Sequence, residues 1–145
     1  MSTQTYPAIV DLVPHAGAMV LLDALTEWQK GYARCSALIR EHAPFVKQGS
    51  VSAEVTIEYM AQAVAACLGY EAITGGGGVR VGMIIACKRF EAHADKLDVG
   101  DRIEVEARCI SGNETLSHFE CKLTRADEVF SEATLTLYHA ESLPQ

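Results

Sequence analysis

The sequence predicts an α+β fold in which one curved antiparallel sheet of six strands surrounds one long central helix. Two observations lead to it. A stretch of about 20 residues favours a helix and is apolar on all sides, as in a helix buried in the middle of a structure. The segments before and after it have the alternating or continuous apolar patterns of strands. Because such a helix needs sheet on most of its sides, we expect both parts to share one core.

Two strands are expected before the helix. Residues 7–12 suit a short helix with proline in its first turn. The nearly continuous apolar run 19–25 favours a buried strand, and 34–40 alternates well enough for a second one. Lys30 and Gly31 suit the turn between them, and residues 41–52 are expected to form a loop.

The helix is expected over residues 53–72. This stretch is rich in Ala, Met, Gln, Leu and Glu, which are good helix formers, and it contains no proline. Four consecutive glycines at 75–78 are expected to end it.

Four strands are expected after the helix, in an antiparallel meander. Residues 79–90 are rich in Val, Ile and Met, and the later segments alternate between apolar and polar residues. Those later strands are expected at 103–109, 119–123 and 133–137, with turns at 98–101, 112–114 and 127–128.

Length, charge and cysteine usage narrow the class of protein. The 145 residues suit one domain, 1–145, and the net charge of −7 argues against a nucleic-acid partner. The five cysteines form no CxxC motif and no His/Cys cluster, so we expect no metal and no cofactor. The N-terminus does not resemble a signal peptide, and the apolar stretch 51–73 carries too many carboxylates to cross a membrane. We therefore expect a cytoplasmic protein with reduced thiols.

Glu58 is a carboxylate near the start of a very apolar segment. Burying it would cost several kcal/mol, in order of magnitude, which differences in helix propensity cannot offset. One interpretation places Glu58 at the helix N-terminus, partly exposed and favoured by the helix dipole. The other makes it an acid or base in an apolar cleft.

Several short stretches together resemble one enzyme family. The segment I-E-Y-M-A-Q-A at 57–63 is similar to the helix of the hot-dog-fold 3-hydroxyacyl-[acyl carrier protein] dehydratases. The segment V-P-H-A-G-A-M-V-L-L-D at 13–23 resembles their opening, and P-F followed by Q-G at 44–49 resembles the loop before their helix. K-R-F at 88–90 and V-G-D at 99–101 complete the set, in the family's order. More narrowly, the chain looks like the small dehydratase-like proteins of aryl-polyene and fatty-acid-like synthesis systems.

The resemblance implies a hot-dog fold and a dimer whose active sites lie between protomers. It implies dehydration of 3-hydroxyacyl thioesters on acyl carrier protein to 2-enoyl thioesters, without a cofactor. That reaction needs a base beside the carbonyl, an acid for the departing hydroxyl and a donor for the thioester oxygen. In the family, a histidine is the usual base and the helix glutamate acts on the hydroxyl.

The sequence departs from the family at that histidine. The family has it in G-H-F-P-G before the helix, where this chain has Q-G-S-V-S at 48–52. Of the five histidines, His15 is the candidate to act with Glu58, because the resembling loop lies near the family's active cleft. A purely structural His15 is the alternative.

Three more residues are candidates for binding or orienting the substrate: Gln62, Ser50 and Gly49. Gln62 is four residues after Glu58 and shares its helix face, so it either orients Glu58 or satisfies a backbone group. Ser50 contributes a hydroxyl or is a helix-cap candidate.

The expected partners follow from the resemblance. The first is an acyl carrier protein with its phosphopantetheine-linked acyl group. Since carrier proteins are acidic and this chain is too, a local basic patch is needed, and Lys88, Arg89 and Arg80 are its candidates. The second is another subunit, in a homodimer, a heterodimer with another hot-dog dehydratase, or a higher oligomer. No nucleic acid or membrane partner is expected.

Two alternative functions remain open at this stage. The missing histidine favours a non-catalytic hot-dog subunit that pairs with an active dehydratase. An acyl thioesterase of the same fold is the other, because a helix glutamate also activates water.

Overall fold

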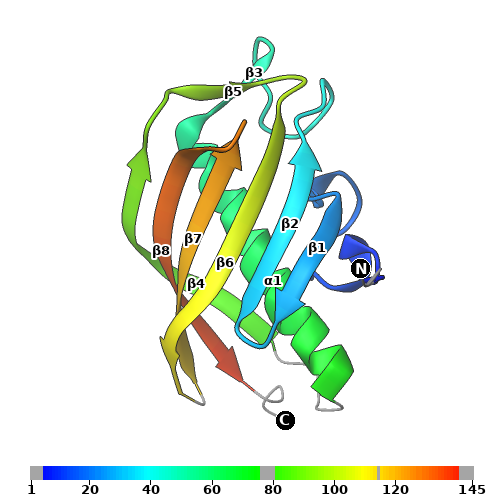
Figure 1. Ribbon diagram of the computed structural model, residues 1–145, viewed down its shortest axis with the longest axis vertical. Helices are drawn as coiled ribbons and strands as arrows, with labels where there is room; N and C mark the ends of the chain where they lie inside the picture. The colour runs from blue at the N-terminus through cyan, green and yellow to red at the C-terminus, as the bar shows by residue number, and fades with distance from the viewer. Residues whose placement is uncertain (1–4, 76–80, 114, 141–145) are drawn as a thin grey trace.

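A computed structural model describes residues 5–75, 81–113 and 115–140. Figure 1 shows a curved six-stranded sheet in front of one long helix, α1. The strand order is β1-β2-β6-β7-β8-β4, and every neighbouring pair is antiparallel. Two of these strands precede the helix and four follow it, so the predicted six-stranded architecture around one helix is confirmed.

The strands of the large sheet have these bounds: β1 Ala24–Gln29, β2 Tyr32–Leu38, β4 Val81–Ala92, β6 Arg102–Gly112, β7 Leu116–Arg125 and β8 Glu128–Ala140. Two further strands, β3 Ser50–Ser52 and β5 Lys96–Asp98, pair with each other as a separate ribbon. The alternating pattern of the sequence is visible in β6, where Ile103, Val105 and Ala107 are buried and Glu104 is exposed.

The helix α1 covers Thr56–Gly75 and is preceded by a 3-10 turn, η3 (Ala53–Val55). The predicted helix at 53–72 is therefore confirmed, with its first turn in the tighter 3-10 form. Met60, Ala63 and Val64 are fully buried in the core that α1 shares with the sheet. The Thr56 hydroxyl lies 2.9 Å from that of Ser131 on β8, a buried polar contact between the start of the helix and the sheet. Gly75 is the last helical residue, and glycines 76–78 lie outside the described residues.

The strand expected at 19–25 was wrong. The segment contains the end of a 3-10 turn, η2 (Gly17–Met19), and β1 begins only at Ala24. The reason is tertiary: the Met19 carbonyl and the Leu21 N–H bond to the side chain of Gln62 on α1 and not to a neighbouring strand. The short helix expected at 7–12 is a 3-10 turn, η1 (Ile9–Asp11).

The meander expected after the helix is correct for three of its four strands. β6, β7 and β8 pair in sequence order, but β4 pairs with β8 at the far edge of the sheet. β2 pairs with β6, so the strands before the helix join the end of the meander that is farthest from β4. β3 and β5 lie at one end of the molecule (Figure 1), where β5 returns the chain from the β4 edge to β6.

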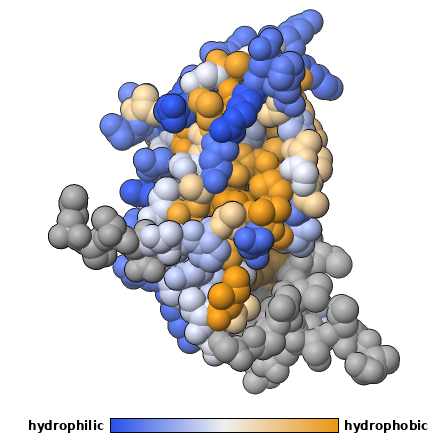
Figure 2. Space-filling view, turned by 90° about the vertical axis from the view of Figure 1, so that its right-hand side faces the viewer, coloured by the Kyte–Doolittle hydropathy of each residue, from blue (hydrophilic) through white to orange (hydrophobic). Residues whose placement is uncertain are grey.

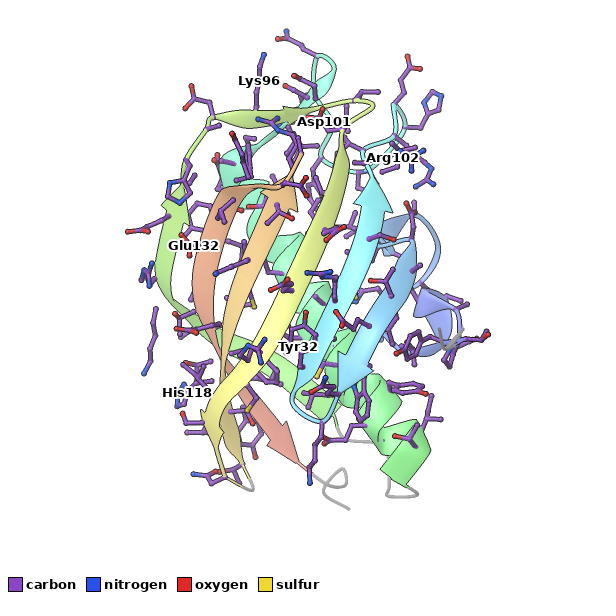
Figure 3. All side chains as sticks on the ribbon, viewed as in Figure 1. Tyr32, Lys96, Asp101, Arg102, His118 and Glu132 are labelled. Atoms are coloured by element: carbon purple, nitrogen blue, oxygen red, sulfur yellow. The ribbon has the colours of Figure 1, made fainter. Side chains whose placement is uncertain are left out.

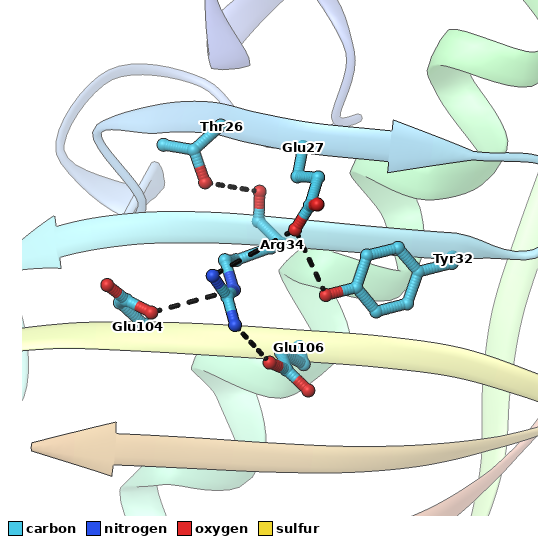
Figure 4. A network of polar contacts seen from close by, with 6 residues as sticks. All are labelled: Thr26, Glu27, Tyr32, Arg34, Glu104 and Glu106. Carbon is cyan, nitrogen blue, oxygen red and sulfur yellow. Dashed lines mark hydrogen bonds and ion pairs between the residues drawn. The ribbon is translucent and has the colours of Figure 1, made fainter. Parts of the chain in front are cut away.

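The outer face of the sheet is polar and carries a network around Arg34 (Figure 4). Its guanidinium lies 2.7 Å from Glu106, 3.5 Å from Glu104 and 3.9 Å from Glu27. The Tyr32 hydroxyl also bonds to Glu27, at 3.4 Å. These contacts join β1, β2 and β6, so the network fixes their register on the solvent side. Within the described part of the chain, no helix is long and apolar enough to cross a membrane.

Candidate active site

The segment that carries His15 is held against α1 at both of its ends. At one end, the Leu12 carbonyl lies so close to Gly69 that a Cβ there would be 2.1 Å from the oxygen. At the other end, the Gln62 amide donates to the Met19 carbonyl at 2.7 Å and accepts from the Leu21 N–H at 2.8 Å. His15 is therefore positioned beside the helix by contacts on both sides of it in the sequence.

Gln62 is fully buried, and each end of its amide has a backbone partner. The interpretation that Gln62 satisfies backbone groups therefore describes the structure, and no hydrogen bond from it to Glu58 is found among the described residues. Its role is to hold the 19–21 segment on the helix.

Glu58 lies in the first turn of α1 and is exposed, between neighbours that are buried or half-buried. Its position resolves the apparent conflict with the apolar helix, since it lies on the side that the sheet leaves open. The positive end of the helix dipole favours a carboxylate there. Among the described residues, Glu58 has no hydrogen-bond or ion-pair partner. A free carboxylate at this place is available for a ligand.

Beside Glu58, the open side of α1 carries a stripe of apolar residues. Ile57, Ala61, Ala65 and Leu68 are partly buried and follow one helical stripe next to Glu58. Figure 2 shows an apolar area in the middle of the side of the molecule that faces right in Figure 1. An apolar strip that begins beside a carboxylate suits a ligand with a polar head and a hydrocarbon chain.

His15 is half-buried, and its Nδ1 is shielded from solvent without a hydrogen-bond partner among the described residues. A buried N–H without an acceptor costs more than an unpaired ring acceptor, which favours the tautomer with its proton on Nε2. Nε2 is then a donor. A neutral histidine that takes a proton at Nε2 carries its own proton on Nδ1 instead.

No described hydrogen bond or ion pair joins His15 to Glu58. The helix rises about 1.5 Å per residue, so Gln62 and Gly69 lie about 6 Å and 16 Å along its axis from Glu58. His15 belongs to the segment fixed between those two contacts. A substrate between Nε2 of His15 and the Glu58 carboxylate would therefore have to span part of the apolar strip, or meet these groups from two different subunits.

The loop residues predicted at the site lie around β3. Gly49 has φ +79°, a left-handed conformation that glycine adopts without strain. Its carbonyl accepts from the Val99 N–H at 3.0 Å. Ser50 begins β3 and its hydroxyl is 3.5 Å from the Lys47 carbonyl, so it is not the helix cap. No described hydrogen bond joins Ser50 or Gly49 to His15.

The basic candidates lie on β4. Lys88 and Arg89 are exposed, and the Arg89 guanidinium is 3.1 Å from Glu91. Arg80 lies outside the described residues. A cavity of about 300 Å³ lies elsewhere, lined by residues such as Asp23, Arg102 and Asp127, and its described lining contains none of the predicted site residues.

Solved structures share this fold. The dehydratase heterocomplex ApeI:P from Xenorhabdus doucetiae matches with a TM-score of 0.87 and 20% identity, over 92% of this chain and 91% of that one. A hypothetical thioesterase with coenzyme A from Streptococcus pneumoniae matches with a TM-score of 0.65 and 11% identity, over 83% and 88% of the two chains. The PaaI protein of the E. coli phenylacetic acid degradation operon gives 0.63 and 9%, over 79% and 80%. The hot-dog fold is thereby confirmed.

Sequence comparison gives the family. No curated protein matches the chain significantly. The family model of the ApeP-like dehydratases, described as ApeP dehydratase, matches residues 7–145. That match covers nearly the whole chain, including the His15 segment, α1 and all strands of the sheet, and this protein therefore belongs to the ApeP-like dehydratase family.

Proposed function

We propose that this chain dehydrates 3-hydroxyacyl thioesters carried on acyl carrier protein to 2-enoyl thioesters. The family supplies the reaction type. The observation that carries the proposal is the exposed Glu58 carboxylate, without a partner among the described residues, at the start of the apolar strip on α1. In this arrangement the acyl chain lies along the strip, and its C2 and C3 atoms lie near Glu58.

Glu58 carries both proton transfers. Its carboxylate takes the proton from C2, the C2–C3 double bond forms as the C3–O bond breaks, and the new carboxyl gives the same proton to the departing hydroxyl. Water leaves, and the carboxylate is regenerated. This assignment accounts for the missing loop histidine, because no second base is then needed.

His15 acts as a donor in this scheme. With its proton on Nε2, it hydrogen-bonds the thioester oxygen while negative charge builds there. Its buried Nδ1, without a partner in the described structure, supports this role over that of a base. Gln62 keeps the His15 segment in place through its two backbone bonds.

A second hot-dog subunit completes the site. His15 and Glu58 of one chain have no described contact, and the similar ApeI:P structure is a heterocomplex of dehydratases. The partner covers the open side of α1. Lys88 and Arg89 on β4 meet the acidic carrier protein.

The test is turnover of a 3-hydroxyacyl thioester on carrier protein, followed by mass spectrometry, for the chain alone and with a co-expressed hot-dog partner. We expect loss of one water from the wild type and none from Glu58→Gln. His15→Ala should be slower by about 10²–10³-fold, the usual effect of removing one such donor. His15→Gln, which keeps an N–H but cannot act as a base, should retain more activity than His15→Ala.

Matched controls are Glu54→Gln, an exposed carboxylate one turn earlier, and His42→Ala, an exposed loop histidine. Both should turn over like the wild type. A free acid and a thiol as products would show that the chain hydrolyses the thioester and does not dehydrate it. A wild type that stays inert with every partner, while folded, would make the chain a non-catalytic subunit.

A further inference from the structure

We propose that Glu91, His93 and Glu132 bind a divalent transition-metal ion, with Zn²⁺ as the first choice. One ligand atom from each of the three lies within 4.8 Å of the others. They gather where β4 meets β8, near the Glu132 labelled in Figure 3. This site is separate from His15 and Glu58, and it does not depend on the proposed function.

The backbone holds all three ligand positions. Glu91 and Glu132 are direct partners in the β4–β8 ladder, and alternate residues of a strand share one face. The His93 N–H donates to the Phe130 carbonyl at 2.8 Å, which ties the end of β4 to β8. An ion would therefore bind to a preformed backbone, and only side chains would need to move.

The two carboxylates at the site attract a cation, and two neighbouring basic residues compete with it for them. Two carboxylates directly opposite each other in an antiparallel pair repel. The surrounding cations are Arg89, 3.1 Å from Glu91, and Lys122, the ladder partner of Glu132 on β7. His93 Nε2 lies 3.1 Å from the Glu132 carboxylate. A divalent ion would neutralise both carboxylates and take the imidazole lone pair.

The donor set selects the class of metal. Imidazole suits Zn²⁺, Ni²⁺ and related ions, whereas sites for Ca²⁺ and Mg²⁺ use oxygen ligands. Tetrahedral Zn²⁺ has bonds of about 2.0–2.2 Å, so its ligand atoms lie about 3.4 Å apart. The His93–Glu132 contact of 3.1 Å is close to that separation. Glu91, with 53% of its side chain exposed, has to leave Arg89 and rotate toward them.

Calorimetric titration of untagged protein with Zn²⁺ tests the proposal. We expect one saturable site per chain. His93→Ala and Glu132→Gln should each weaken binding by at least about tenfold. Arg89→Gln removes a cation that competes for Glu91 and should tighten binding. The matched control is His118→Gln on β7, whose ring lies 3.0 Å from the Thr136 hydroxyl and which should bind like the wild type.

Binding by thiols must be distinguished, because Cys87 on β4 is also exposed. Co²⁺ as the probe should give visible d–d bands without a thiolate charge-transfer band, and Cys87→Ser should leave them unchanged. The proposal fails if no site saturates below about 100 μM, if His93→Ala binds as tightly as the wild type, or if Cys87→Ser abolishes binding.

Discussion

Gly69 shows how one residue fixes the position of a whole segment. A Cβ built on it would lie 2.1 Å from the Leu12 oxygen and 3.0 Å from the Leu12 carbonyl carbon. Both atoms belong to the backbone, so they cannot move aside as a flexible side chain does. The absence of a side chain at 69 therefore lets η1 and the His15 segment lie directly on α1.

Gly69→Ala should lower the free energy of unfolding by about 1–3 kcal/mol, the usual cost of overpacking. Urea denaturation measures it. The matched control is Gly75→Ala at the end of the same helix, where no atom of the described residues lies within 4 Å of an added Cβ. Equal stability of the two variants would show that the Leu12 segment moves away without cost.

Glu58 is the residue for which the sequence left two interpretations open. The structure supports partial exposure near the helix N-terminus, which was one of them. That position is compatible with the catalytic interpretation as well, because a substrate can reach an exposed carboxylate beside an apolar strip. The burial of Tyr59 and Met60 and the exposure of Glu58 follow from which side of α1 the sheet covers.

At the scale of elements, α1 and the 19–21 segment depend on one side chain. Gln62 replaces the strand partner that Met19 and Leu21 would otherwise need. This is why an apolar run typical of a strand is not one in this protein. The local sequence pattern cannot reveal these two hydrogen bonds, because they join residues that are 41 and 43 positions apart.

Gln62→Leu should destabilise the fold although leucine is apolar and close in size. The buried Leu21 N–H would lose its partner, at about 1–3 kcal/mol, and the Met19 carbonyl would lose one as well. Urea denaturation measures the total loss in the free energy of unfolding. Faster amide hydrogen exchange at Leu21 would show that the loss arises there. The control is Gln29→Leu at the exposed end of β1, which should be nearly neutral. An unchanged exchange rate at Leu21 would contradict the hydrogen bond between its N–H and the Gln62 side chain.

Strand order is also decided at this scale. The sequence predicted that four strands follow the helix, and three of them form the meander. β4 pairs with β8 and not with β6. This pairing depends on which edge of the sheet the chain reaches after the end of α1. The same pairing brings Glu91 opposite Glu132 and so forms the group of possible metal ligands with His93. The spacing of Cys and His in the sequence could not indicate this group.

At the scale of the whole molecule, three thiols share one core. Burial raises the pKa of Cys35 and of Cys67 to about 12, and it raises the pKa of Cys121 as well. In the unfolded chain these thiols ionise near their ordinary pKa of about 8.5–9. Unfolding then releases protons at high pH, so stability is fully present below pH 9 and is lost as the pH rises toward 12.

The free energy of unfolding should therefore fall from about pH 9 upward, by at most about 1.4 kcal/mol per pH unit for each thiol. Urea denaturation at a series of pH values measures the slope. Cys87→Ser, at an exposed position, should leave the slope of stability against pH unchanged, and Cys35→Ala should make that slope smaller. A stability that stays constant between pH 8 and 10 would contradict the burial of these thiols.

By itself, the sequence determined the long helix, the number of strands in the large sheet and their order along the chain. Helix propensity, alternation and turn residues act over neighbouring positions, so they are readable without tertiary contacts. The motifs around Glu58 and His15 likewise pointed to the dehydratase family, which the family match over residues 7–145 confirms.

Only the tertiary structure decided which edge β4 occupies, that 19–21 bonds to Gln62 and that Glu58 is exposed. It also decided that Nδ1 of His15 is buried without a partner among the described residues. Each of these depends on groups far apart in the chain. The burial of a polar atom is fixed by whichever distant segment packs over it, and no local pattern records that segment.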